Sequence, residues 1–282
     1  MTLFRLLIFI QVLLMLCSTQ TIQAAGPSRP AIVMIAFGTS VDEARKVFDF
    51  IDRQARRRFP EHDLRWAFTS QFIIDKLKKR GVVTYNVEEI ISQLHEQGHR
   101  QVVFQSLHVA PGQEYRSVLA ADTGDLEVAY GTALLTSDAD IERAIDALQV
   151  HIDHEQPTVV VAHGNDRYPQ FNQRIEAFAT RIETRYPRLA VASVEGSPGL
   201  EPLQKIKALQ PQQVNFVPLM IVAGDHIRND VLGDEPDSWK NIVAAPEVSV
   251  SPSMGWNQEI LEIYFDHLEQ ALAQLEAGKG SN

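Results

Sequence analysis

Two stretches of this chain repeat one another, and this internal duplication restricts its fold more than any other feature. Residues 101–114 align without a gap on residues 213–226, and residues 35–39 align on residues 161–165. Two copies of one supersecondary unit must bury the same apolar faces in the same way. We therefore expect the chain to fold into two similar lobes.

Each copy alternates apolar strands with amphipathic helices. Residues 31–37 are a continuous apolar run, as are residues 158–162, and both runs predict buried parallel strands. Residues 169–185 are predicted to form one of the intervening helices. Strands that alternate with helices imply right-handed crossovers and parallel sheets. The predicted fold class is α/β, with a parallel sheet flanked by helices in each lobe.

The boundary between the lobes is predicted in residues 149–157, where the pattern restarts. This gives an N-terminal lobe of residues 26–152 and a C-terminal lobe of residues 153–282. The last predicted element is an amphipathic helix over residues 257–275, which is expected to close the C-terminal lobe.

The start of the chain has the composition of a secretory signal peptide. Residues 1–5 are short and basic, residues 6–16 are apolar apart from one glutamine, and residues 19–25 are small and polar. We assign residues 1–25 to the signal, with cleavage after Ala24 or Ala25, and expect the mature chain in the periplasm. The apolar run with its flanks is too short for a spanning helix.

Cys17 is the single cysteine of the chain, and it lies within the signal. A mature chain without cysteine needs no oxidase, which agrees with export. The alternative is a lipoprotein signal with Cys17 as the lipidated residue. Leu16 fits that alternative poorly, because a small residue is expected directly before the lipidated cysteine.

Composition and motifs exclude several classes of partner. The net charge of -10 argues against a nucleic-acid partner. The sequence has neither a Walker A loop nor a G-x-G-x-x-G motif, so nothing supports nucleotide binding. Beyond the signal, no segment is long and apolar enough to enter a membrane. The sequence leaves open whether the chain forms a homo-oligomer.

The two copies differ at the ends of three strands, where chemistry is expected. The second copy carries His163, Glu195 and His226 where the first carries Phe37, Thr69 and Glu114. Ligands gather at the carboxyl ends of parallel strands, so all six residues could line one cleft if the sheets face each other. Two imidazoles and a carboxylate form a divalent-metal site with room for a further ligand.

Each of the three second-copy residues also has a simpler interpretation. His163 could bond backbone at a strand end, Glu195 could pair with an arginine, and His226 could be a solvated loop residue. Three such residues at equivalent points of three strands favour a metal site over three unrelated explanations.

Four further residues are weaker candidates. Asp225 is expected to orient His226, and Asp166 could do the same for His163. His95 and His99 are four residues apart in a predicted helix, a spacing that can bind a second metal or a haem iron. The simpler interpretation of His95 and His99 is a solvated helix end, and haem has no other support in the sequence.

Ten short segments together resemble the anaerobic cobalt chelatase of cobalamin biosynthesis. They are residues 37–40, 43–45, 59–60, 67–70, 107–108, 111–112, 114–115, 163–165, 194–196 and 224–226. Their order and spacing cover essentially the whole mature chain. That family belongs to the class II chelatases, which need no ATP and share a two-lobed fold with ferrochelatase.

The resemblance implies a function and assigns roles to the candidate residues. It implies insertion of Co2+ into sirohydrochlorin held between the lobes, with His163 and His226 as the active-site histidines and Glu195 as the metal-binding acid. His163 is the expected proton acceptor. The expected macrocycle contacts are Phe37, Thr39 and Glu114.

Export leaves the physiological macrocycle and metal open, because members of this family usually act in the cytoplasm. One alternative is a periplasmic carrier of metal or tetrapyrrole without turnover. Another is an iron chelatase, since an open site of two histidines and a carboxylate selects poorly between Co2+ and Fe2+.

Overall fold

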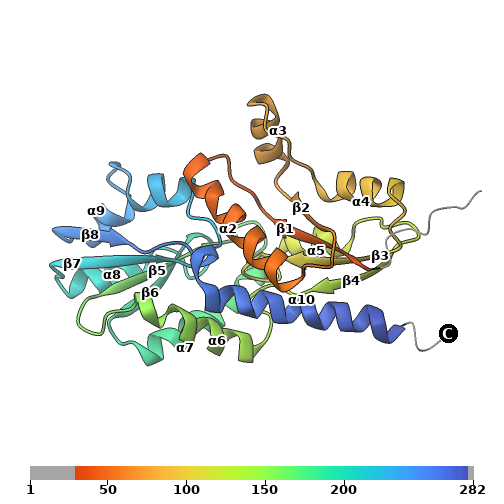
Figure 1. Ribbon diagram of the computed structural model, residues 1–282. Helices are drawn as coiled ribbons and strands as arrows, with labels where there is room; N and C mark the ends of the chain where they lie inside the picture. The colour runs from red at the N-terminus through yellow and green to blue at the C-terminus, as the bar shows by residue number, and fades with distance from the viewer. Residues whose placement is uncertain (1–28, 279–282) are drawn as a thin grey trace, which may run out of the picture.

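A computed structural model describes residues 29–278, so the predicted signal peptide lies outside the described residues. The described chain forms two four-stranded sheets with helices packed on them (Figure 1). The first sheet contains β1 (Ala31–Ala36), β2 (Leu64–Phe68), β3 (Gln101–Ser106) and β4 (Glu127–Gly131). The second contains β5 (Thr158–Gly164), β6 (Leu189–Glu195), β7 (Gln213–Pro218) and β8 (Glu247–Val250).

The two sheets have the same topology, which confirms the predicted fold class. The strand orders are β2-β1-β3-β4 and β6-β5-β7-β8, and every pair is parallel. The register is duplicated too: Val33 pairs with Phe104 in the first sheet, and the aligned residues Val159 and Phe216 pair in the second.

One pairing corrects the sequence alignment by a single residue. Ala36 pairs with Phe68 in the first sheet, whereas the equivalent Ala162 pairs with Ser193. Extending both registers places Glu195 level with Ser70 rather than with Thr69. A one-residue offset reverses which side of the sheet a side chain faces, so Thr69 and Glu195 are not structural equivalents.

Several helices begin at a polar residue whose side chain accepts a hydrogen bond from a free backbone N–H group. Asn86 and Ser137 each make a capping box, at the starts of α4 and α6. The helices are α2 (Asp42–Arg58), α3 (Gln71–Lys79), α4 (Val87–Glu96), α5 (Gln113–Leu119), α6 (Asp138–Leu148), α7 (Gln173–Arg185), α8 (Pro202–Ala208), α9 (Trp239–Val243) and α10 (Gln258–Gly278). No helix in this part of the chain combines the length and apolar character needed to cross a bilayer.

The closing helix α10 follows the second sheet in sequence but packs on the first. It lies against β3, β4 and α6, as Figure 1 shows. The buried Tyr264 of α10 donates its hydroxyl to the backbone carbonyls of Leu107 (3.1 Å) and His108 (3.2 Å), just beyond β3. The sequence predicts that the helix over residues 257–275 closes the C-terminal lobe. The structure corrects this, because the helix packs on elements of the N-terminal lobe.

One apolar core connects the two halves. Ile32 and Met34 of β1 belong to the same buried cluster as Val160 of β5 and Phe265 of α10. Each sheet has a further cluster on its other face. Because side chains of both halves fill the shared core, the two sheets are held in a fixed relation.

Two ion pairs of different exposure join α10 to α6. His267 Nε2 lies 3.1 Å from Asp140 Oδ1, with both side chains nearly buried, and Arg143 lies 2.6 Å from the exposed Asp266. Burial by itself raises the pKa of Asp140, but hydrogen bonds from Ser137 and the contact with His267 outweigh it and lower that pKa.

We expect Asp140→Ala to lower the free energy of unfolding by about 1–3 kcal/mol at pH 7, because His267 loses its buried partner. Asp266→Ala, which removes an exposed pair from the same interface, should cost about 0–1 kcal/mol. A carboxyl with a lowered pKa stabilises the fold above its unfolded pKa of about 4 and loses that effect as pH falls through the folded value. Asp140→Ala should therefore lower the free energy of unfolding by less at pH 3.5 than at pH 7. Urea unfolding at pH 7 and pH 3.5 checks this, and equal losses for the two variants would contradict it.

Candidate metal centre between the two sheets

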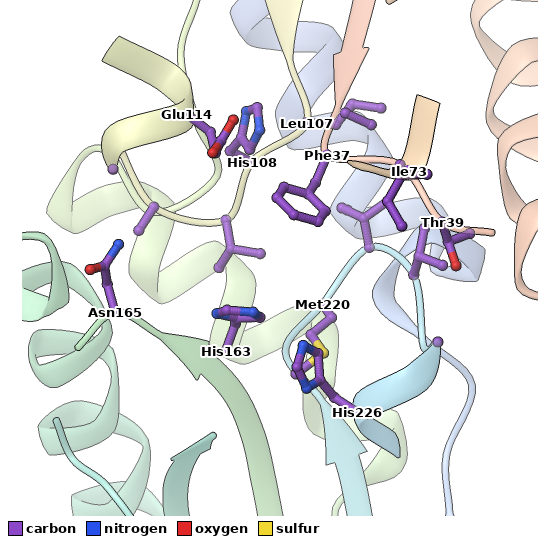
Figure 2. Close-up of a pocket in the computed structure, with 18 of the residues that line it drawn as sticks. Phe37, Thr39, Ile73, Leu107, His108, Glu114, His163, Asn165, Met220 and His226 are labelled. Atoms are coloured by element: carbon purple, nitrogen blue, oxygen red, sulfur yellow. The ribbon is translucent and has the colours of Figure 1, made fainter. Parts of the chain in front are cut away.

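A cavity of about 650 Å³ opens between the two halves, at the carboxyl ends of the strands. Both halves line it, as expected for parallel α/β sheets whose ligand edges meet. Seven residues singled out from the sequence line this cavity: Phe37, Thr39, Glu114, His163, Glu195, Asp225 and His226. Figure 2 shows His163 and His226 below the Phe37 ring. Thr69 does not line the cavity, in keeping with the corrected register.

His163 lies near the carboxyl end of β5 with its ring exposed to the cavity. Its Nδ1 is 2.9 Å from the backbone carbonyl of Gly164. A carbonyl only accepts, so Nδ1 must carry the proton. Nε2 then keeps its lone pair and is available to a metal.

Two glycines allow β5 and β6 to converge beside His163. Gly164 has a φ of 75°, and a Cβ there would lie 1.7 Å from the carbonyl oxygen of Glu195. Gly196 has a φ of 64°, and a Cβ there would lie 2.4 Å from the carbonyl oxygen of Asn165. No other residue type fits either place without moving the backbone. These glycines therefore set Glu195 beside the strand end that carries His163.

His226 precedes a π-helical turn, η3 (Ile227–Val231), which follows the loop after β7. Its Nδ1 lies 2.6 Å from Asp230 Oδ2, one helical turn further on. Turns of this kind frequently occur at functional sites. The carboxylate holds the Nδ1 proton, so the Nε2 of His226 also keeps a free lone pair.

Asp230, and not Asp225, is the carboxylate that orients His226. Asp225 is exposed and lines the cavity without a contact to that imidazole. The prediction for Asp225 relied on adjacency in sequence, whereas helical geometry brings residues four apart together. Asp166 does not reach His163 either: its Oδ1 accepts from the Gly196 N–H at 2.5 Å and steadies the β6 end.

The two histidines face one another across a short gap. Their ring centroids are 4.8 Å apart and the ring planes meet at 87°. Both Nδ1 atoms are engaged and both Nε2 atoms are free, the arrangement that two imidazole ligands of one cation require. Glu195 is half-buried in the same cavity. Residues 29–278 contain no group of three or more His, Cys, Asp or Glu side chains already arranged around a metal position.

His108, which sequence reasoning gave no role, is a third imidazole on the cavity wall. Burial lowers its pKa to about 4, so the ring is neutral at physiological pH. Its Nδ1 lies 2.8 Å from Ser106 Oγ, and its Nε2 lies 3.4 Å from Thr69 Oγ1. His108 therefore presents a neutral polar group to the cavity. It comes from the first half of the chain, whereas His163 and His226 come from the second.

The first half contributes an apolar surface to the cavity. Phe37 follows β1 and keeps 48% of its surface exposed, which is unusual for a phenylalanine at the end of a buried strand. Thr39 is buried, and a Cβ on Gly224 would lie 3.1 Å from its Oγ1. The loop before His226 thus packs closely against the loop after β1. Glu114 lies in the first turn of α5 and also faces the cavity (Figure 2).

His95 and His99 are not brought together. Helix α4 ends at Glu96, and Gly98 has a φ of 77°, so His99 does not continue the helical face that carries His95. His95 contacts the backbone carbonyl of Thr123 and the side-chain carboxylate of Asp125, while the buried His99 lies 3.0 Å from Asp63. The predicted spacing required one continuous helix, and the glycine turn interrupts it.

The sequence model of the cobalt chelatase (CbiK) family matches residues 30–273, which include both halves of this site. The chain belongs to the cobalt chelatase (CbiK) family. Among curated relatives, the sirohydrochlorin cobaltochelatase of Salmonella typhimurium is 31% identical over 263 residues, covering 86% of this chain and 97% of the relative. The sirohydrochlorin cobaltochelatase CbiKC of Nitratidesulfovibrio vulgaris is 28% identical, covering 88% and 93%.

Solved structures share the fold of this CbiK-family chain. The sirohydrochlorin chelatase SirB of Bacillus subtilis subspecies spizizenii, in complex with cobalt, superimposes with a TM-score of 0.61 at 13% identity, covering 88% of this chain and 97% of that chain. CbiX, the terminal enzyme of sirohaem biosynthesis in denitrifying bacteria, gives a TM-score of 0.54 at 14% identity, covering 86% and 99%. At these identities the likeness extends to the architecture only.

We expect Asp230→Asn to weaken Co2+ binding roughly tenfold or more, because the amide no longer holds the His226 Nδ1 proton as a carboxylate does. Asp225→Asn, which removes the same charge from the neighbouring cavity wall, should change the affinity by less than about threefold. Calorimetric titration of both variants with Co2+ at pH 7.5 separates the two. A larger effect at Asp225 would contradict the assignment of Asp230.

Proposed function

We propose that this chain is an ATP-independent cobalt chelatase that inserts Co2+ into sirohydrochlorin after export from the cytoplasm. The observation that carries the proposal is the facing pair of His163 and His226. Both present a free Nε2 to one cavity between two parallel sheets, in a chain of the cobalt chelatase family. The Salmonella and Nitratidesulfovibrio relatives, both named for this activity, supply the substrate class.

The histidine pair receives the metal substrate. Neutral imidazole is a borderline ligand that suits Co2+, and two such ligands leave most coordination positions open for the incoming macrocycle. Glu195 adds a negative charge on the same cavity wall and attracts the cation. His226 is the firmer ligand, since the Asp230 carboxylate behind it fixes the orientation and tautomer of its ring.

The reaction also releases two protons from the pyrrole nitrogens for each cation inserted, so the site needs a proton acceptor. His163 is suited to this step because it is exposed to the cavity and backed only by a neutral carbonyl. As the metal leaves its Nε2 for the ring nitrogens, the freed lone pair can take one pyrrole proton, and the second passes to solvent water at the open mouth of the cavity. His108 cannot serve in the same way, because a pKa of about 4 makes it a poor base.

The first half supplies the surface for the macrocycle. The exposed face of Phe37 can stack on a flat conjugated ring, and Thr39 and Glu114 lie on the same side of the cavity. Hydrogen bonds made by the Thr39 hydroxyl or accepted by the Glu114 carboxylate would orient the ring so that its nitrogens face the histidine pair. Nucleotide binding has no part in this scheme.

The proposal of export rests on residues 1–25, which have the pattern of a signal peptide. The first strand, β1, begins shortly afterwards at Ala31. N-terminal sequencing of the protein from a periplasmic extract should begin at Ala25 or Gly26. Recovery of full-length protein in the cytoplasm alone would contradict export.

Purified mature protein should metalate sirohydrochlorin with Co2+ over many turnovers without added nucleotide. His163→Ala should remove nearly all activity, because it deletes both a metal ligand and the proton acceptor. Glu195→Gln should raise the KM for Co2+ more than the KM for the macrocycle, since it keeps the shape and loses the charge. The absorbance change on metalation measures all three. Metalation that stops at one equivalent per protein would favour a carrier over an enzyme.

A further inference from the structure

Two basic side chains line the cavity, one from each half of the chain. Lys76 is on α3, and Arg167 follows β5, four residues after His163. Among the described residues, they are the lysine and arginine that the cavity lining contains, beside the acidic Glu114, Glu195 and Asp225.

No carboxylate within residues 29–278 neutralises either cation, although Lys78 and Arg80, close to Lys76 in sequence, are both paired. On α3 and just after it, Lys78 lies 2.8 Å from Glu89 and Arg80 lies 2.5 Å from Asp42. Lys76, on the same helix, makes no ion pair, and Arg167 makes none in the second half. Unpaired cations at a cavity in a protein of net charge -10 mark a place for an anionic ligand.

Each cation lies over an aromatic ring. Lys76 Nζ is 5.9 Å from the centroid of Phe72, and Arg167 Cζ is 5.3 Å from the centroid of Tyr168. Contacts at this range favour positions of the charged end over the ring. Phe72 is 72% exposed and itself lines the cavity, so an apolar face accompanies the charge. In Figure 1, α3 projects from the body of the first half.

We propose that Lys76 and Arg167 bind peripheral carboxylates of the tetrapyrrole and fix its orientation between the two halves. This inference rests on the proposed function, because it takes a macrocycle with acetate and propionate side chains as the ligand. Two anchors on different halves restrict rotation of the ring in its own plane. Arg167 is close in sequence to His163, so the anchored ring is positioned relative to the metal ligands.

Equilibrium binding of metal-free sirohydrochlorin, followed by its fluorescence, tests the anchors without requiring metal or turnover. Lys76→Gln and Arg167→Gln should each raise the Kd roughly tenfold, as expected for loss of one hydrogen bond to a charged group. If the two anchors act independently, the double variant should lose roughly a hundredfold. Lys76→Arg and Arg167→Lys should retain most of the affinity, and Co2+ affinity should be unchanged throughout.

Two matched controls remove the same charge elsewhere. Lys79→Gln is on the same helix as Lys76, and Arg188→Gln is in the second half; both side chains are exposed and neither lines the cavity. Each control should stay within about twofold of the wild type. Equal losses in controls and cavity variants would overturn the anchors in favour of a general charge effect.

Other outcomes separate the anchors from the function on which they rest. Wild-type turnover with unchanged Kd values in the cavity variants would overturn the anchors and leave the chelatase activity in place. A wild-type protein that binds no sirohydrochlorin would overturn both.

Discussion

The shared apolar core between the two sheets is the constraint on which the site depends. β1 and β5 bury side chains in one cluster, and α10 crosses from the second sheet to cover the first. Parallel strands present their carboxyl ends along one edge of each sheet, and the core fixes how the two edges meet. A cavity lined by both halves follows from that arrangement. His163 and Glu195 lie in the last two residues of β5 and β6, and His226 lies at the end of the loop that follows β7.

The internal duplication explains how the two halves can share one fold and carry different side chains at their strand ends. The strands and most of their register are common to both copies. At equivalent strand ends the first copy has the apolar Phe37 and the second has His163. The chemistry of the pair is refined by its backing groups: a carbonyl behind His163 and the Asp230 carboxylate behind His226. A cavity with Phe37 on one wall and two histidines on the other suits a planar ligand that must receive a metal from one side.

The sequence was sufficient for the fold class and for the position of the principal residues. Continuous apolar runs identify buried strands, and the gapless repeat identifies where the copies diverge, so His163 and His226 were both placed in the cavity. The sequence alignment placed Glu195 opposite Thr69, one residue away from its structural equivalent Ser70. Thr69 and Ser70 are both small hydroxyl residues, so polarity alone does not tell which of them corresponds to Glu195. Asp225 and Asp230 are both aspartates close to His226 in sequence, and only the π-helical turn decides which of them contacts its ring. The sheet on which α10 packs could not be predicted either, because an amphipathic pattern shows that a helix has a buried face without showing which sheet covers it.

In the sequence, Lys76 and Arg167 do not differ from other surface cations. Only the fold brings α3 and the end of β5 to the same cavity.

The central claim is that one Co2+ binds between His163 and His226. An anomalous difference map, calculated from crystals soaked in Co2+ and measured at the cobalt absorption edge, locates the ion directly. The account predicts a peak within bonding distance of both Nε2 atoms, on the cavity side of the rings, and its disappearance in His226→Ala crystals. A peak at His95 or His99, or one that persists in the cavity of His226→Ala at full height, would contradict it.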